Sequence, residues 1–448
     1  MKKQYLYLLL LMFFGVTVSF VVIKYKKIQQ EDTAATYKLL PRQGAAANSV
    51  EWTAAKNNTD NLLAKLTANP RDHKAALALA NAYILEARIT GNAAYYDKAA
   101  LNTVENILAT DHQHHEALML KSLLQLSQHH FAEGLETAQL AEKINANNAF
   151  VYGLLVDANI EMGNYEAAVD AADKMVSARP DLRSYSRIAY IREIHGDYNG
   201  AINAMQLAVQ AGVPAEEATE WCRSQLGKLY ELTGNAENAR LQYQLSLAAR
   251  PGYAHALAGM GRIASTQKKY DSAVYYFEQA ALIISDLGIK QNLAQVYLYA
   301  GQPKKATALN NEVIREMKKN TNNISDDPSA GHYSDKEIAY AYLQQNDMDK
   351  ALEHALAEYN RRPKNIEVNE TMAWVYYKRN EFAKALPYAT ASLVTNARNP
   401  ILLCTAGLIN AEAGNKTQAK LMLQAALQLQ PAIPEEIKTK SVQALQKL

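Results

Sequence analysis

The sequence predicts an all-α fold, an α-solenoid built from one repeated pair of short helices, and three observations predict it. Near-copies of one segment recur along the chain: GNYEAAVDAADKMVSARP at 163–180, then GDYNGAINAMQLAVQAGVP from 196, GNAENARLQYQLSLAARP from 234 and GNKTQAKLMLQAALQLQP from 414. Apolar residues within each copy follow the spacing of one helical face. The 19 glycines and 12 prolines in 448 residues are too few for a loop-rich chain.

Each repeating unit is expected to be two amphipathic helices joined by a tight turn. In residues 226–251, Leu226 and Tyr230 lie on one face of the first helix. Gly234 ends that helix, and Pro251 ends the second because proline cannot continue a helix. One such pair cannot bury its apolar stripe alone, so the next pair must cover it.

Two positions of the unit recur throughout the chain. An alanine, whose small side chain lets the paired helices approach closely, stands at Ala168, Ala201, Ala239, Ala273, Ala306, Ala351, Ala385 and Ala419. A turn residue stands at His129, Gly163, Gly196, Gly234, Lys268, Gly301, Asn346, Asn380 and Gly414. This spacing predicts nine units between roughly 115 and 433, and a tenth over roughly 73–114 in which residues 85–97 lengthen the turn. Residues 321–331 have no apolar period and predict a surface loop.

These units resemble the tetratricopeptide repeat (TPR), with its pattern of W-x2-L-G-x2-Y, then A-x3-F, then P. The resemblance is carried by LGKLY at 226–230, LAQVY at 293–297, IAYAY at 338–342 and MAWVY at 372–376. It implies a right-handed superhelix of about ten helix-turn-helix units with a concave groove. With the flanking segments, the predicted organisation is a membrane anchor at 1–27, a polar linker at 28–50, the solenoid at 51–433 and a capping helix at 434–448.

The N-terminus is the one break in composition. Residues 5–23 are mostly apolar and lie between two lysine clusters. About 20 such residues span a bilayer as a helix, whereas the apolar core of a cleaved signal peptide has about 7–15. The sequence therefore predicts a single-pass membrane protein with an uncleaved transmembrane helix, and cleavage is the alternative. The flanking lysines are nearly balanced, so an extracytoplasmic solenoid is favoured and a cytoplasmic-facing one remains open.

Composition and motifs exclude several function classes. The chain has 47 basic and 45 acidic residues without a long block of like charge, which argues against nucleic-acid binding. Its two cysteines, Cys222 and Cys404, have no metal-binding spacing, and no G-x-S-x-G, H-E-x-x-H or P-loop motif is present. We therefore expect no enzyme activity, no cofactor, no metal site and no small-molecule substrate.

The groove implied by the resemblance is the candidate binding site, because proteins similar to this one bind peptides or partner proteins there. The expected partner-binding residues are the aromatic and basic ones at groove positions of the first helices: Tyr190, Trp221, Lys228, Arg262, Tyr299, Lys336, Tyr340, Trp374, Tyr377 and Lys378. Since the cations recur on one predicted face, the partner segment is expected to be acidic or to carry a carboxylate.

The sequence thus favours a membrane-anchored adaptor or assembly factor that recognises peptide segments or partner proteins. Two alternatives remain. One is a purely structural scaffold or spacer of an envelope complex, assembled through the convex face or the ends. The other is a non-catalytic accessory subunit of an enzyme complex. The repeat by itself does not choose among them, because unrelated functions share one fold.

Overall fold

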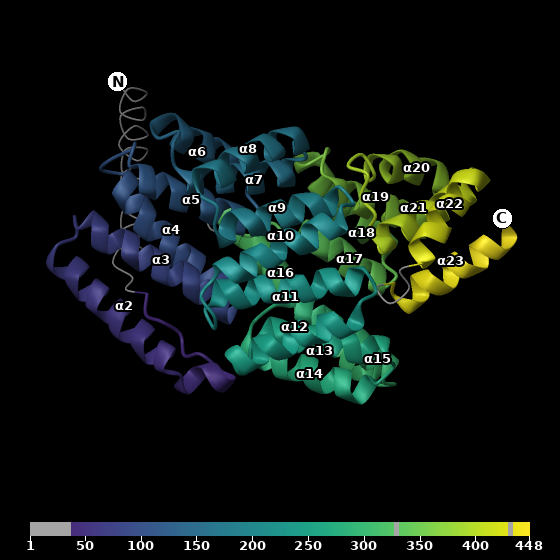
Figure 1. The fold of residues 1–448 in the computed structure, drawn as a ribbon, viewed down its shortest axis with the longest axis horizontal. Coiled ribbons are helices and arrows are strands. Elements are labelled where there is room, and N and C mark those ends of the chain that lie inside the picture. The colour runs from purple at the N-terminus through teal and green to yellow at the C-terminus, as the bar shows by residue number, and fades with distance from the viewer. Residues whose placement is uncertain (1–36, 327–330, 429–432) are drawn as a thin grey trace, which may run out of the picture.

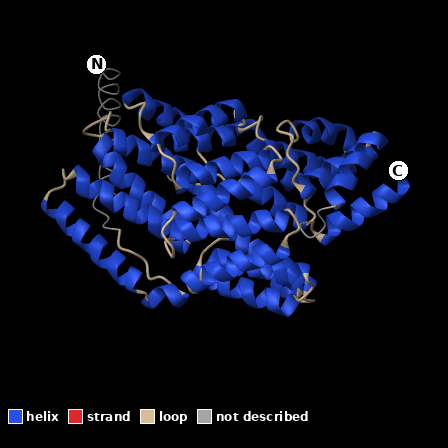
Figure 2. Cartoon of the chain, in the orientation of Figure 1, coloured by secondary structure: helices blue, strands red, loops and turns tan. Residues whose placement is uncertain are grey.

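The computed structural model describes residues 37–326, 331–428 and 433–448. These residues form 22 α-helices and one short 3-10 helix, and no strand occurs among them (Figure 2). After η1 (Gly44–Asn48) and α2 (Val50–Ala68), twenty helices pack as ten consecutive pairs, numbered here units 1 to 10. The last helix, α23 (Glu435–Lys447), lies where the capping helix was predicted and packs on unit 10.

The units have the following bounds. Unit 1 is α3 (His73–Thr90) and α4 (Ala93–Leu108), unit 2 is α5 (His115–Ser127) and α6 (Phe131–Ile144), unit 3 is α7 (Ala149–Met162) and α8 (Tyr165–Ala178), unit 4 is α9 (Leu182–Ile194) and α10 (Tyr198–Ala211), and unit 5 is α11 (Glu217–Leu232) and α12 (Ala236–Ala249). Unit 6 is α13 (Ala254–Thr266) and α14 (Tyr270–Ile283), unit 7 is α15 (Leu287–Tyr299) and α16 (Pro303–Asp326), unit 8 is α17 (Asp335–Gln344) and α18 (Met348–Arg361), unit 9 is α19 (Ile366–Lys378) and α20 (Phe382–Ala391), and unit 10 is α21 (Pro400–Glu412) and α22 (Lys416–Leu427).

Every turn inside a unit contains one residue in the left-handed conformation. All nine predicted turn residues have a positive φ, and Gly91 supplies the tenth turn. Their φ angles lie between 58° and 84°. Glycine adopts this region without steric cost and asparagine tolerates it, whereas His129 and Lys268 adopt it at a cost. The turn prediction is therefore confirmed at each position.

The recurring alanines hold the paired helices together. All eight are at most 1% exposed, and each lies on the second helix of its unit. Larger core side chains fill the space between successive units, such as Tyr243 and Phe277, which are 0% and 1% exposed. Because every unit covers the apolar face of its neighbour, the hydrophobic core runs along the stack.

The superhelix coils so that its second half (units 6–10) touches its first half (units 1–5). Figure 1 shows the path: α3 to α8 lie on the left, α9 to α11 near the middle, α12 to α15 at the bottom, and α19 to α22 in the upper right. The turns of units 1 to 4 each meet a linker between later units. The bonds are Ser285 N to Thr90 O (2.9 Å), Tyr333 N to Gln128 O (3.2 Å), Asn365 Nδ2 to Glu161 O (3.0 Å) and Thr395 Oγ1 to Ile194 O (2.6 Å).

The segment before α2 packs on the solenoid. We call residues 37–49 the N-terminal strap, and they formed part of the predicted polar linker. Arg42 is 4% exposed and pairs at 2.5 Å with Glu86, which is 1% exposed. At the other end, Gly44 lies against Ile283 of unit 6. The strap therefore connects unit 1 to unit 6 through contacts that its polar composition does not reveal.

Two local predictions differ from the structure. Residues 85–97 were expected to lengthen the turn of unit 1, but the extra residues extend α3, which has 18 residues and ends at Thr90. Residues 321–331 were expected to be a surface loop, but α16 continues to Asp326, and Gly331 is buried where its carbonyl meets His130. Residues 327–330 of the predicted loop lie outside the described residues.

The predicted single-pass membrane localisation is corrected here. Within 37–326, 331–428 and 433–448, none of the helices is long and apolar enough to cross a membrane. The predicted span at 5–23, with the anchor at 1–27, lies outside the described residues.

Candidate functional site

The first helices of the units line the concave side of the superhelix. Successive first helices contact one another, as α17 contacts α19 and α19 contacts α21. Elements on the inside of a curve crowd together, so these helices form what we call the inner face. All ten predicted partner-binding residues lie on first helices: Tyr190 on α9, Trp221 and Lys228 on α11, Arg262 on α13, Tyr299 on α15, Lys336 and Tyr340 on α17, and Trp374, Tyr377 and Lys378 on α19.

Three of the four predicted cations are already paired with carboxylates of the same chain. The pairs are Arg262 Nη2 with Glu231 Oε1 (2.9 Å), Lys336 Nζ with Glu367 Oε2 (2.5 Å) and Lys378 Nζ with Glu436 Oε1 (2.7 Å). Lys228 is exposed and forms no such pair within the described residues. The inner face therefore does not present the row of free cations on which the expectation of an acidic partner depends.

The contacts between the two halves bring distant inner-face residues together. Asn365 donates to the Glu161 carbonyl, Arg362 pairs with the Glu161 carboxylate, and Ile366 N donates to Tyr165 Oη at 2.8 Å. The end of α7 is thereby fixed against the start of α19. Eight side chains influence one another electrostatically around this junction, and we call them the inner-face cluster: Glu161, Tyr190, Glu193 and Lys228 from the first half, and Lys336, Tyr340, Glu367 and Glu370 from the second.

The electrostatic effects act between members of the cluster on different helices. The Lys336 ammonium holds the pKa of Glu367 far below its usual range. The Glu367 carboxylate, together with burial, raises the pKa of Tyr190 well above its ordinary value. Tyr190 is on α9 and Glu367 on α19, so this effect acts between the two halves of the chain.

Three carboxyl groups of the cluster are electrostatically strained. Burial, with Glu367 nearby, raises the pKa of Glu161 and of Glu370 to about 7. Burial also raises the pKa of Glu193, although Lys228 acts in the opposite direction. These shifts mean that the ionised carboxylates lack sufficient compensating positive charge.

The remaining predicted residues lie elsewhere on the inner face. Trp374 is 8% exposed, belongs to a hydrophobic core cluster and stacks on Tyr377 with ring centroids 5.0 Å apart. Tyr299 packs against Tyr270, and Trp221 packs against the core of units 4 and 5. Four of the ten, Tyr190, Lys228, Lys336 and Tyr340, are brought together in the cluster.

The sequence analysis missed the acidic half of the cluster. It selected aromatic and basic residues at groove positions and passed over Glu193, Glu367 and Glu370, which occupy groove positions of α9 and α19. The same positional rule, applied to every polar residue type, identifies them. The ion pair that joins Lys336 to Glu367 across adjacent units follows the same repeat spacing.

A cavity of about 370 Å³ lies apart from the cluster, beneath the N-terminal strap. Its walls are mainly apolar and come from the strap, the end of α3 and the linkers around units 5 and 6. Arg42, Arg88 and Arg250 at its edge are paired with Glu86, Glu217 and Glu51 respectively. None of the ten predicted residues lines it.

No protein-family model matches the chain, and no curated protein matches it either. Solved structures of helical-repeat proteins do. A structure of MamA is 20% identical and covers 35% of this chain and 90% of its own, with a TM-score of 0.29. The APC/C hetero-tetramer Cut9–Hcn1 is 14% identical and covers 87% and 67%, with a TM-score of 0.38. A human IFIT1 dimer with PPP-AAAA is 14% identical and covers 82% and 89%, with a TM-score of 0.44.

The three matched structures are at most 20% identical to this chain, and their TM-scores are all below 0.5. Their identities and TM-scores are too low to carry an argument about function, so the assignment of class rests on the chain's own geometry. Ten helix pairs with matching turns and matching buried alanines define it as an α-solenoid repeat protein.

Proposed function

We propose that this chain is an adaptor that binds a segment of a partner protein on its inner face, without catalysis of its own. The observation that carries the proposal is the inner-face cluster. Its tyrosines and charged groups converge on one concave surface from two halves of the chain, and they are only partly covered. A surface fixed by contacts between the halves loses little conformational entropy on binding, which favours recognition.

The composition of the cluster suits a protein ligand. Tyr190 and Tyr340 are half-buried, and tyrosine combines a large apolar ring with a polar tip. The charged groups beside them supply orientation and specificity. The residues of the cluster come from five helices, α7, α9, α11, α17 and α19, so a ligand that contacts them all must extend over several helices, as a segment of chain does.

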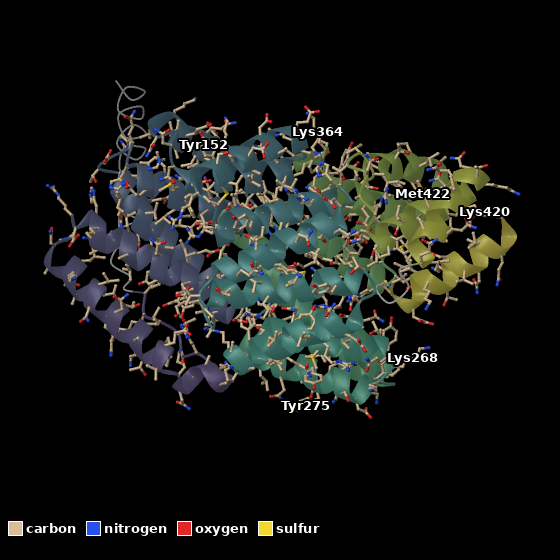
Figure 3. The ribbon with its side chains drawn as sticks, viewed as in Figure 1. Tyr152, Lys268, Tyr275, Lys364, Lys420 and Met422 are labelled. Atoms are coloured by element: carbon tan, nitrogen blue, oxygen red, sulfur yellow. The ribbon has the colours of Figure 1, made fainter. Side chains whose placement is uncertain are left out.

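A site-specific photocrosslinker tests this proposal. Placed at Tyr340, it is expected to form an adduct with one contiguous segment of a partner. Placed at Tyr275, which is 58% exposed on α14 and visible at the molecular edge in Figure 3, it is expected to form none with that segment. The same partner captured at Tyr275 and not at Tyr340 would remove the inner-face proposal.

A structural scaffold is the second candidate, favoured by apolar side chains on the outer helices. Leu207, Leu245, Tyr275 and Leu282 are between 43% and 58% exposed on α10, α12 and α14. Exposed apolar residues repeated over neighbouring elements are typical of assembly surfaces. In this case Leu245→Ser and Tyr275→Ser would abolish partner binding, whereas changes in the inner-face cluster would leave it intact.

A further inference from the structure

The turn of unit 2 meets the second half of the chain in a different way from the turns of its neighbours. In units 1, 3 and 4 the turn residue is Gly91, Gly163 or Gly196, and a Cβ on any of them would come within 2.7 Å of a linker backbone. In unit 2 the turn residue is His129, which has a φ of 62° although this conformation disfavours a side chain. Imidazole side chains therefore make the contact in unit 2, where the neighbouring turns use the close approach of glycine.

Three histidines lie at this contact. His129 Nδ1 donates to the Tyr333 carbonyl at 2.8 Å, and His130 Nε2 donates to the Gly331 carbonyl at 2.6 Å. A carbonyl oxygen only accepts, so each of these two nitrogens carries a hydrogen. The His332 ring lies against the His129 ring, with centroids 4.1 Å apart. The turn of unit 2 and the linker before α17 are thus joined through imidazole rings that come from both sides.

Cations surround these rings. Arg362 Cζ lies 4.4 Å from the centroid of the Phe131 ring, and that ring stacks on His129 with centroids 5.1 Å apart. Arg361 Cζ lies 4.2 Å from the centroid of the Tyr333 ring, whose carbonyl His129 binds. A proton added to His129 would therefore place a positive charge close to two guanidinium groups and to a second imidazole.

The carboxylates near the contact are already engaged. Glu358 pairs with both Arg361 and Arg362, and Glu337 lies 4.0 Å from the Lys336 ammonium. The charged groups around the contact are the cations Lys336, Arg361 and Arg362, the carboxylates Glu161, Asp335, Glu337, Glu358 and Glu367 that pair with them, and His354, which pairs with Asp335.

The pKa values of two of the rings agree with this geometry. Burial lowers the pKa of His129 to about 4, and the charges of Lys336 and Arg362 act in the same direction. Burial, with His129 nearby, lowers the pKa of His332 to about 3. A histidine freed from the contact has a pKa of about 6.5. The separated state therefore binds these protons more tightly, so the contact is fully stable above about pH 6.5 and weakens as the pH falls towards 4.

We propose that the contact between the turn of unit 2 and the linker before α17 is an acid-sensitive switch between a closed and an opened superhelix. At neutral pH, His129 and His332 carry no charge and hold the linker against the turn. In mild acid, separation allows each imidazole to take up a proton, so the opened state becomes more populated. The units themselves remain folded, because the buried alanines that hold each helix pair together do not titrate.

Hydrogen exchange of the Tyr333 backbone amide tests the proposal, because this amide donates to the Gln128 carbonyl at 3.2 Å across the contact. A protection factor removes the pH dependence of the chemical exchange step. In the whole chain we expect the protection factor to fall at least tenfold between pH 7 and pH 5. In the double variant His129→Asn/His332→Gln it should not fall, since neither new side chain titrates and asparagine tolerates the left-handed turn.

Two carboxyl groups titrate in the same range with the opposite sign. Burial raises the pKa of Asp97 to about 6 and that of Glu161 to about 7, so both favour the closed state as the pH falls. Both groups are kept in the double variant, and the difference between the two proteins therefore reports the histidines. The control His112→Gln changes an exposed histidine before α5 and should keep the full pH dependence.

A protection factor that is the same at pH 7 and pH 5 in the wild type would overturn the proposal, as would an equal fall in the double variant. Loss of protection throughout α21 at pH 5 would overturn it too, because the whole molecule would then be unfolding. Should the double variant lack protection already at pH 7, His332→Gln alone decides, since it keeps the bond from His129 to the Tyr333 carbonyl. Its fall should be at least about threefold smaller than that of the wild type, and an undiminished fall contradicts the switch.

Discussion

At the scale of single residues, the ten left-handed turn positions show how one local requirement recurs with different side chains. Six are glycine, and the others are His129, Lys268, Asn346 and Asn380. The short side chain of asparagine can form a local hydrogen bond that compensates for the left-handed conformation, whereas the lysine side chain forms none. The turn of unit 6 is therefore held in a conformation that its residue disfavours, with a φ of 58°.

Lys268→Gly should raise the free energy of unfolding by about 1 kcal/mol, since glycine adopts the left-handed region freely. Lys268 is exposed, as Figure 3 shows at the lower right, so few contacts are lost. Urea denaturation measures the change. Asn346→Gly is the matched control and should gain less, and an equal gain in both would contradict the explanation.

A second prediction at this scale concerns Asp97, which is 3% exposed on α4 and accepts a hydrogen bond from Ser127 Oγ at 2.8 Å. Burial raises its pKa to about 6. The folded state therefore binds this proton more tightly than the unfolded state, and the carboxyl group destabilises the fold progressively as pH rises from about 4 to 6.

Asp97→Asn should consequently stabilise the protein by about 2 to 3 kcal/mol at pH 8, with the gain disappearing near pH 4. Thermal denaturation across this pH range measures it. Asp170→Asn, at an exposed position on α8, serves as the control. A gain for Asp97→Asn that does not change with pH would show that ionisation is not its cause.

At the scale of helices, the start of α19 combines an ordinary cap with a contact between the halves. Asn365 Oδ1 accepts from Glu367 N (2.9 Å) and Val368 N (3.1 Å), and its Nδ2 donates to the Glu161 carbonyl. Asn399 caps α21 in the same way, accepting from Ile401 N at 2.9 Å, but its side chain makes no bond to the described part of the first half. Comparing the two asparagines therefore distinguishes the contribution of the helix cap from that of the contact between the halves.

Asn399→Ala should cost about 1 kcal/mol, the usual value of a helix cap. Asn365→Ala should cost a further 1 to 3 kcal/mol or so, because the carbonyls of Ile160 and Glu161 lose their donor. Chemical denaturation of the two variants compares them directly. Similar losses in both would mean that the bond to Glu161 contributes nothing measurable.

At the scale of the whole molecule, the contacts between the halves distinguish this solenoid from an open array. In an open array each unit touches only its neighbours, and stability is a sum of local terms. Here the turn of unit 3 lies against the linker before unit 9: a Cβ on Gly163 would come within 2.5 Å of the Lys364 backbone. Around Gly234, which has nearly the same φ, nothing lies within 4 Å.

Gly234→Ala should cost about 1 kcal/mol from backbone strain alone. Gly163→Ala has the same strain and also forces the halves apart, so we expect at least about 2 kcal/mol more. In Gly163→Ala, the rate of backbone amide hydrogen exchange should increase in α19 as well as in α7 and α8. An effect confined to unit 3 would show that the halves are independent.

The sequence by itself determined the unit: which residues turn, which alanines are buried, and how many pairs follow one another. These features are local, because each depends on side chains within one helix pair and on the preference of glycine and asparagine for left-handed turns. The groove positions of Tyr190, Lys228, Lys336 and Tyr340 could be read in the same way, since helical spacing fixes which residues share a face.

Only the tertiary structure decided what those residues meet. Asn365 and Glu161, joined by a hydrogen bond, are 204 residues apart, and no local pattern encodes such a contact. The pairing of Lys336 with Glu367, the position of the strap and the excess of carboxylates in the inner-face cluster all depend on how far the superhelix coils in each unit. The total coiling of the superhelix is the sum of small rotations between successive units. A slight change in each rotation would therefore separate the halves and leave the structure of every unit unchanged.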